Sequence, residues 1–430
     1  MLHFTFAIAL AMQFLASPFF PVCLSSRFLL TSCHVLPANC LLPCGMQEKL
    51  KIVSVQPAHV LSLENVGQLQ GGSPPLGQRF VFRSQRNLVF DGPERIADFE
   101  FRGNFHFQVH PTRDIIVAQE YLTELSVDLI SILDFHGKTL YQIRCERYLG
   151  RRESSTQAVA GFEGDGSFFL IVPQDISNSK IHTWPANTPI ESLGDFKLAT
   201  DSFDFGYSCF ILEPPTLPGW RTVETPLIED CHRCTNFRTV DGKVEIAQEV
   251  TNDWHNSIAF SPDDREYLAY NYSKTGEMVI EKYSRHEGER QLETFADWPY
   301  DDPEYKFDRD FPSDEKFYLN SKWAIFRTEF LNRIYLLNTE SMRFVAELEI
   351  EGFELGLVKT RIGEGKTRPD QYRFYYAGEY EGALCSYVEQ ILRCDKYLVA
   401  RCVVGTKEKP TNQLAFIELE AIIAALERSN

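Results

Sequence analysis

The chain reads Ile258-Ala259-Phe260-Ser261-Pro262-Asp263-Asp264-Arg265-Glu266-Tyr267-Leu268-Ala269-Tyr270 between residues 258 and 270. A short apolar segment runs into a turn rich in Pro and Asp, and a segment with apolar residues at alternate positions leaves it. This order is typical of a β-hairpin, because Pro and Asp favour tight turns and alternation places apolar side chains on one face of a strand.

Related phrases recur along the chain at residues 109–118, 162–170 and 311–319, and a degenerate copy occupies 209–214. With Pro111, Gly164, Pro214, Pro262 and Pro312 as markers, the successive steps are 53, 50, 48 and 50 residues. A period of about 50 residues gives room for one small sheet of three or four strands. The sequence therefore predicts repeated β units of similar size.

Further strand-like segments follow several of these turns, at 129–138, 278–283 and 334–339, and a final pair lies at 397–400 and 414–419. One small sheet cannot bury both faces alone, and radial stacking into a closed ring buries them and protects the strand edges. The predicted fold is all-β: a β-propeller of seven or eight blades, each a four-stranded antiparallel sheet. A short helix over 418–428 should follow. The alternative is a large β-sandwich or two unrelated all-β domains.

The residues that carry a family resemblance are the string from Phe260 to Ala269 and the triplet Ile132-Leu133-Asp134. The first resembles the characteristic turn of the WD-repeat propellers, and the second lies where that family often carries Trp-Asp. The likeness covers residues 100–345, without a Gly-His/Trp-Asp set repeated through the units. The chain thus looks like a divergent WD-repeat-like propeller, and the resemblance implies a rigid rim that binds a protein or peptide.

The first 45 residues differ in composition from the rest. They contain no Asp or Glu, Arg27 as their single Lys or Arg, and four of the eleven cysteines. They fit a secretory signal, a membrane anchor, or translated upstream sequence before a true start at Met46. We expect residues 1–45 to lie outside the fold and residues 46–430 to form a single propeller domain.

The remaining cysteines indicate the compartment. Seven of them are scattered through residues 46–430, an odd number without a disulfide framework. Free thiols are typical of a reducing compartment, so the sequence favours the cytoplasm. Export is the alternative if residues 1–45 act as a signal.

The formal net charge of −17, from 60 acidic and 43 basic residues, limits the partners. Nucleic acid and anionic membranes are disfavoured, because both would on average be repelled. The basic runs 144–152 and 359–368 are interpreted as solvated loops. The acidic and aromatic stretch 297–310 could bind a basic or carbohydrate ligand, but an inter-blade connection is the favoured interpretation.

No motif points to chemistry. Cys231-His232-Arg233-Cys234 lacks a second ligand pair for zinc. The glycine-rich segment 71–77 lacks the Lys-Ser/Thr that completes a P-loop, and the Gly-x-Gly at 363–365 is an equally weak phosphate signal. The resemblance implies a structural role for His255. We therefore predict no catalytic, cofactor-binding or metal-binding residue and no cofactor.

The expected function is that of a non-catalytic, monomeric platform for a protein or peptide. The alternatives are a structural ring within a larger assembly, or a glycosidase-like or lactonase-like propeller enzyme. Such an enzyme would need carboxylates and histidines from several blades to converge in a central channel.

Overall fold

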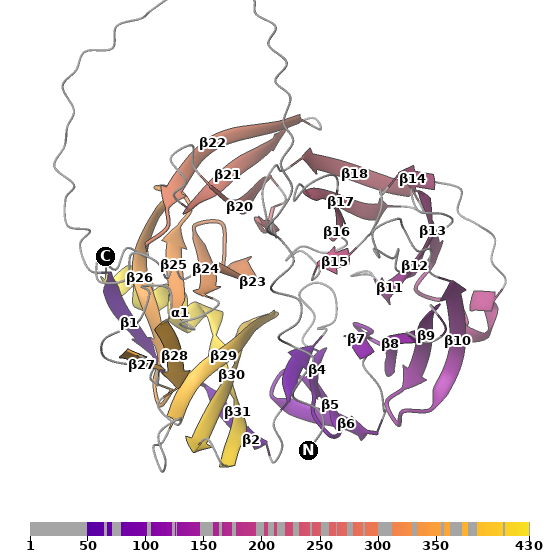
Figure 1. Ribbon diagram of the computed structural model, residues 1–430, viewed down its shortest axis with the longest axis horizontal. Coiled ribbons are helices and arrows are strands. Elements are labelled where there is room, and N and C mark those ends of the chain that lie inside the picture. Colours follow the sequence, from indigo (N-terminus) through magenta and orange to yellow (C-terminus); the bar gives the residue numbers. More distant parts are fainter. Residues whose placement is uncertain are drawn as a thin grey trace, which may run out of the picture. The chain divides into compact units, whose positions relative to one another are not determined.

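The computed structural model describes most of the chain between residues 50 and 429 (Figure 1). The described ranges are 50–63, 67–70, 79–100, 105–122, 125, 127–146, 158–162, 166–173, 178–194, 202–204, 210–212, 220–226, 232–240, 243–250, 258–263, 265–272, 278–286, 289–299, 312–328, 333–353, 357–361, 372–376, 385–406 and 409–429. For 202–250 and 357–376 the description covers the backbone alone. The predicted segment 1–45 lies outside these ranges.

Four consecutive strands form each of six sheets in the described part of the chain, and neighbours in each sheet are antiparallel. The first three sheets contain β3 (Gln68–Gln70), β4 (Arg79–Arg83), β5 (Asn87–Asp91) and β6 (Glu94–Phe99); β7 (Phe105–Val109), β8 (Ile115–Leu122), β9 (Val127–Asp134) and β10 (Thr139–Glu146); and β11 (Val159–Phe162), β12 (Phe168–Pro173), β13 (Asn178–Trp184) and β14 (Ser202–Asp204). A 3₁₀ turn, Ile190–Gly194, lies between β13 and β14.

The next three sheets repeat this arrangement. They contain β15 (Phe210–Leu212), β16 (Trp220–Pro226), β17 (His232–Val240) and β18 (Lys243–Val250); β19 (Ile258–Phe260), β20 (Glu266–Tyr272), β21 (Met278–His286) and β22 (Glu289–Asp297); and β23 (Pro312–Tyr318), β24 (Trp323–Thr328), β25 (Ile334–Asn338) and β26 (Arg343–Ile350). A separate two-stranded sheet, β27 (Leu357–Arg361) and β28 (Tyr372–Tyr376), follows.

The last sheet needs a strand from the other end of the chain. It contains β29 (Cys385–Cys394), β30 (Tyr397–Thr406) and β31 (Lys409–Glu418), and its fourth strand is β2 (His59–Leu63), antiparallel to β31. The preceding strand, β1 (Lys51–Val55), pairs in parallel with β26 and extends that sheet to five strands (Figure 1). We call residues 51–63 the N-terminal strap, because they join two successive sheets. The sequence did not predict this pairing.

Alternate residues of one strand enter different cores. On β8, Ile115 and Val117 belong to the cluster shared with sheet β11–β14, whereas Ile116 and Ala118 belong to the cluster shared with sheet β3–β6. Successive side chains of a strand point to opposite faces, so sheet β7–β10 is buried on both faces. A two-sheet sandwich buries one face of each sheet, so this pattern favours serial stacking over the sandwich alternative.

The same arrangement continues through the C-terminal sheets. Five buried clusters join β3–β6 to β7–β10, β7–β10 to β11–β14, β19–β22 to β23–β26, β23–β26 to β29–β31, and β29–β31 to β3–β6. The first strands of these sheets also contact one another in succession, β19 to β23, β29, β3, β7 and β11. The sheets therefore stack face to face, with their first strands adjoining.

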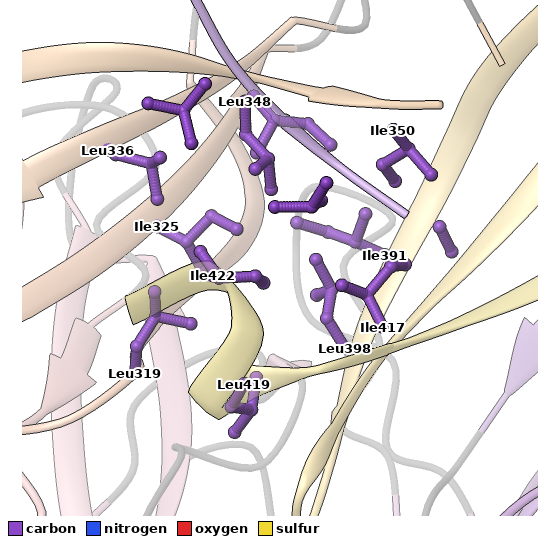
Figure 2. Close-up of a cluster of buried hydrophobic side chains, with 14 of the residues drawn as sticks. Leu319, Ile325, Leu336, Leu348, Ile350, Ile391, Leu398, Ile417, Leu419 and Ile422 are labelled. Carbon is purple, nitrogen blue, oxygen red and sulfur yellow. The ribbon is translucent and has the colours of Figure 1, made fainter. Parts of the chain in front are cut away.

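The predicted C-terminal helix is confirmed as α1 (Leu419–Ser429). Its buried residues Leu419, Ile422, Ala425 and Leu426 lie on one helical face. That face enters the cluster between sheets β23–β26 and β29–β31 (Figure 2), which also holds Val53 of the strap. The helix thus packs beside the last sheet, as expected. Among the described residues, no helix has the length and apolar character required to cross a membrane.

Most of the predicted hairpins are confirmed. The turn after Val109 joins β7 to β8, the turn after Phe162 joins β11 to β12, and the turn after Phe260 joins β19 to β20. The predicted marker Pro214 falls between β15 and β16, outside the described residues. In the 258–270 hairpin, Ser261 N–H donates to Glu266 O at 2.8 Å, and Ser261 Oγ accepts from Glu266 N–H at 3.0 Å.

The predicted turn at Pro312 is wrong. Pro312 begins strand β23, at a sheet edge where its missing N–H is tolerated, and the pairing register shifts between Pro312 and Lys316. The chain turns instead at 319–322, where Asn320 Oδ1 accepts from Lys322 N–H and Trp323 N–H, each at 2.9 Å. An Asn side chain can close a turn without Pro or Gly.

Candidate functional site

Polar side chains from neighbouring sheets meet along the first strands of those sheets. Three of them accept a backbone N–H from the first strand of the next sheet. Gln108 Oε1 accepts from Phe162 N–H at 2.7 Å, Glu315 Oε2 from Ile391 N–H at 3.1 Å, and Gln390 Oε1 from Leu69 N–H at 2.9 Å. This recurring contact satisfies edge N–H groups that would otherwise lack a strand partner.

We call the region where the first strands of neighbouring sheets adjoin the first-strand junction. In this junction, the carboxyl of Glu315 has a shifted pKa. Its side chain is 13% exposed and forms an ion pair with Arg327 on the neighbouring strand β24, whose side chain is 10% exposed. Burial raises the pKa of Glu315, and the Arg327 charge offsets part of that effect. The Glu315 carboxylate connects two sheets, because its Oε2 contacts both Arg327 on β24 and Ile391 N–H on β29.

Arginines make the corresponding contacts through backbone carbonyls. Arg401, whose side chain is 4% exposed, pairs with Glu389 and donates to Gly67 O at the entry to β3. Arg393 donates to Tyr318 O in the preceding sheet. Each guanidinium binds a neighbouring sheet through the planar, multi-donor geometry that suits arginine. The cations of this junction are therefore engaged within the protein.

His110 joins sheet β7–β10 to sheet β11–β14. The residue is 1% exposed, and its Nδ1 accepts from Thr112 N–H at 3.1 Å and from Arg113 N–H at 2.9 Å. Because Nδ1 accepts two bonds, Nε2 carries the proton and donates to Gly166 O, 3.1 Å away. The imidazole organises its own turn and binds the neighbouring one, so it has a structural role.

We expect Gly166→Ala to lower the free energy of unfolding by about 2–3 kcal/mol. Gly166 has φ +87°, and an added Cβ would lie 2.8 Å from His110 Cε1 and Nε2. The control is Gly352→Ala, where φ is +85° and no atom lies within 4 Å of the added Cβ. Chemical denaturation should show a larger loss for Gly166→Ala. Equal losses would mean that backbone strain alone matters and that the His110 contact is dispensable.

Metal ligands and nucleophiles are the groups through which the described residues bear on the enzyme alternative. Within the described ranges, no group of three or more His, Cys, Asp or Glu side chains could hold a metal ion. Burial raises the pKa of the Cys145 thiol to about 12, and burial also raises the pKa values of Cys394 and Cys402. Protonated, buried thiols are poor nucleophiles. In the described part of the chain, the polar contacts of the first-strand junction hold neighbouring sheets together.

The other segments singled out in the sequence are only partly described. Of the acidic stretch 297–310, Trp298 is buried against Phe326, Tyr335 and Phe344, with ring centroids 5.3–6.2 Å apart. Its start thus packs as an inter-sheet connection, and 300–310 lie outside the described residues. Cys234 lies in β17, opposite Glu224. Outside the description lie Cys231, His255, 71–77 and 363–365.

Pairing register was the signal that could have revealed the junction. Glu315 and Arg327 are 12 residues apart, and in the hairpin β23–β24 Lys316 lies opposite Phe326. The misplaced turn at Pro312 hid this relation. Gln108 and Gln390 precede their turns on first strands, but a single polar residue on a strand carries no specific signal.

Solved structures match this chain in comparisons of structure, whereas comparisons of sequence give no match. No protein-family model matches the sequence, and no curated protein matches it. The structure is similar to Kluyveromyces lactis Hsv2, with 10% identity, coverage of 86% of this chain and 98% of that chain, and a TM-score of 0.42.

Two further neighbours are β-propeller domains. The Myceliophteria thermophila Cps50 (Swd1) β-propeller domain has 9% identity, coverage of 84% and 98%, and a TM-score of 0.42. The β-propeller domain of the Trilobed protease from Pyrococcus furiosus has 10% identity, coverage of 84% and 96%, and a TM-score of 0.42.

Proposed function

We propose that residues 46–430 form one seven-bladed, divergent WD-repeat-like propeller that acts as a non-catalytic, cytoplasmic platform for a protein or peptide partner. In this arrangement the six four-stranded sheets and the sheet completed by β2 are the seven blades. Burial of sheets on both faces and the succession of first-strand contacts support it. Sheet β15–β18 would fill the place between β11–β14 and β19–β22.

One observation carries the functional part of the proposal. The polar side chains that different sheets bring together, Gln108, Glu315, Gln390 and Arg401, bind the backbone of a neighbouring sheet. Side chains that bind the backbone in this way hold neighbouring sheets together, which supports a structural role for them. A rigid stack of sheets that presents variable connections is suited to binding.

The test combines two experiments on one preparation: capture of a protein partner, and a screen for enzymatic turnover. The tagged full chain should retain a protein partner through purification, and the purified pair should reconstitute a complex of fixed stoichiometry. The same preparation should give no turnover above buffer on a panel of aryl glycosides and lactones. Saturable turnover, or the absence of any reconstitutable partner, would contradict the proposal.

A further inference from the structure

A buried lysine lies between two carboxylates on sheet β19–β22. Lys282 Nζ, on β21, lies 3.6 Å from Glu266 Oε1 on β20 and 3.5 Å from Glu293 Oε2 on β22, and the Lys282 side chain is 11% exposed. Both distances exceed the length of a normal N–H···O hydrogen bond, about 2.7–3.2 Å. Since a carboxylate offers about four acceptor positions, both carboxylates can accept further hydrogen bonds.

A β-bulge places Glu293 in this group. Lys282 lies opposite Thr294. The next pair is Tyr283 and Leu292, so β22 carries Glu293 as an extra residue at this point. Such an extra residue re-aims a side chain, and bulges are over-represented at sheet edges and next to active sites. The irregularity thus brings the Glu293 carboxylate to the Lys282 ammonium.

These side chains face the next sheet. Leu268 lies directly opposite Lys282 and belongs to the buried cluster between sheets β19–β22 and β23–β26. Opposed residues share one face of a sheet, so Lys282 lies on the face that packs against β23–β26. Tyr318 of β23 belongs to the same cluster and is 0% exposed. It therefore enters the interface from the other side.

The Tyr318 hydroxyl is buried in this interface without a hydrogen bond. Among the described residues, no atom donates to it or accepts from it. Burial raises the pKa of Tyr318, and the charges of Glu266, Asp263 and Glu293 raise it further. The hydroxyl is thus close enough to three carboxylates for their charges to act on it. A buried polar group without a partner costs free energy, and it calls for an explanation in a native structure.

Asp263 adds the third carboxylate, from the hairpin at 258–270. Its Oδ1 accepts from Ser261 Oγ at 2.7 Å, and this hydrogen bond lowers the pKa of Asp263. Two cations, Lys282 and Arg265, lie beside the three carboxylates. Arg265 is 80% exposed and its Nε lies 3.8 Å from Asp263 Oδ2, so water screens that pair. The group keeps an excess of negative charge.

We call Asp263, Glu266, Lys282, Glu293 and Tyr318 the carboxylate site. We propose that this site binds an arginine side chain of the protein or peptide partner, whose guanidinium donates to the two glutamates and to the tyrosine hydroxyl oxygen. A guanidinium has five donors in one plane and is more weakly hydrated than an ammonium, which suits a half-buried site with separate acceptors. This inference rests on the proposed function and names the chemistry of the partner. A basic segment also complements a chain of net charge −17.

A guanidinium fits the site better than a metal ion does. In the part of the chain that the structure describes, no group of three or more His, Cys, Asp or Glu side chains could hold a metal ion. The three carboxylates are thus too far apart to coordinate one ion together, whereas the donors of a guanidinium point in several directions. Calcium is a competing outcome of the test.

The experiment measures binding of a fluorescein-labelled peptide of alternating Arg and Gly to the full chain by anisotropy. Glu293→Gln should weaken binding about tenfold or more, because it removes a charge-assisted hydrogen bond. The matched control is Glu120→Gln, at a half-buried carboxylate of sheet β7–β10, which should weaken binding less than about twofold. A peptide with citrulline, the neutral isostere of arginine, at each Arg position should not bind.

Tyr318→Phe separates binding from folding. It should weaken binding of the Arg peptide about tenfold, because a hydrogen bond to a charged group is lost. It should also keep or raise the melting temperature, because it removes a buried hydroxyl that lacks a partner. The matched control is Tyr397→Phe, at a buried tyrosine of the cluster between β29–β31 and β3–β6, which should leave binding unchanged. A merely structural Tyr318 would change the melting temperature without changing the affinity.

Several results would overturn the inference. These are equal effects of Glu293→Gln and Glu120→Gln, undiminished binding of the citrulline peptide, no binding of the Arg peptide, or binding of Ca²⁺ at Glu293 in its place.

The outcome is separable from that of the proposed function. A captured partner that Glu293→Gln still retains, with no binding of the Arg peptide, would remove the arginine inference and leave the platform. Peptide binding to a chain that retains no cellular partner would have the reverse meaning.

Discussion

A chain that lacks residues 1–63 is expected to lose cooperative thermal unfolding, whereas a chain that lacks residues 1–45 keeps it. The strap supplies β2 to the last sheet, through five residue pairs with β31, and β1 to the edge of β26. Val53 and Val55 of β1 are buried in the cluster that holds α1. Removing them and exposing two sheet edges should remove most of the about 5–15 kcal/mol by which domains are stable. Differential scanning calorimetry of both truncated chains measures whether each still unfolds cooperatively.

A point substitution tests the same strap without truncation. Val53→Asp should cost about 3 kcal/mol or more, because Val53 is 3% exposed and the carboxylate would be buried without a partner. The matched control is Ile52→Asp, at a position 59% exposed, where the cost should stay near about 0.5 kcal/mol. Similar melting temperatures for the two variants would show that β1 does not pack as described.

Arg327→Met is expected to destabilise the protein by about 3–5 kcal/mol, because it leaves the buried Glu315 carboxylate without its cation. Arg327 also holds the Glu315 carboxylate in place, so the hydrogen bond that Glu315 accepts from Ile391 N–H is weakened as well. The control is Arg333→Met, at the residue that precedes β25 of the same sheet. Arg333 pairs with Glu347 at 3.8 Å and is 41% exposed, so its loss should cost less than about 1 kcal/mol. Urea denaturation compares the variants, and a small loss for Arg327→Met would contradict the junction.

The Glu315 carboxyl also predicts a pH dependence. Burial raises its folded pKa above the ordinary value of 4.5, so the folded state holds this proton to higher pH than the unfolded state does. This group's contribution is therefore fully present below about pH 4.5 and is lost as pH rises through the folded pKa. The stability of wild type relative to Glu315→Gln should fall as pH rises above about 4.5. A difference independent of pH would contradict the raised pKa.

Local signals in the sequence were sufficient for the repeated hairpins and for the helix. The phrase at 258–270 combines a Pro/Asp turn with alternation on both sides, and β19 and β20 pair across it. Leu419, Ile422 and Leu426 recur at helical spacing. In each case turn chemistry and periodicity point to the same structure, which makes a local reading sufficient.

Long-range pairing could not be predicted in the same way. Lys51–Val55 and His59–Leu63 are ordinary strand segments, and nothing local identifies β26 and β31 as their partners. The misplaced turn at Pro312 shows the other limit: Pro is a turn former, yet the edge of a sheet accepts it. The Glu315–Arg327 ion pair depends on the register that this error hid.

An experimental structure of the full chain, inspected where the first strands adjoin, tests the proposed propeller. We expect seven sheets stacked in a closed ring, with β2 completing the last sheet and Gln108, Glu315 and Gln390 bound to backbone N–H groups. A cluster of carboxylates and histidines around a metal or substrate at that junction would contradict the platform. Two separate sheet stacks would contradict the propeller.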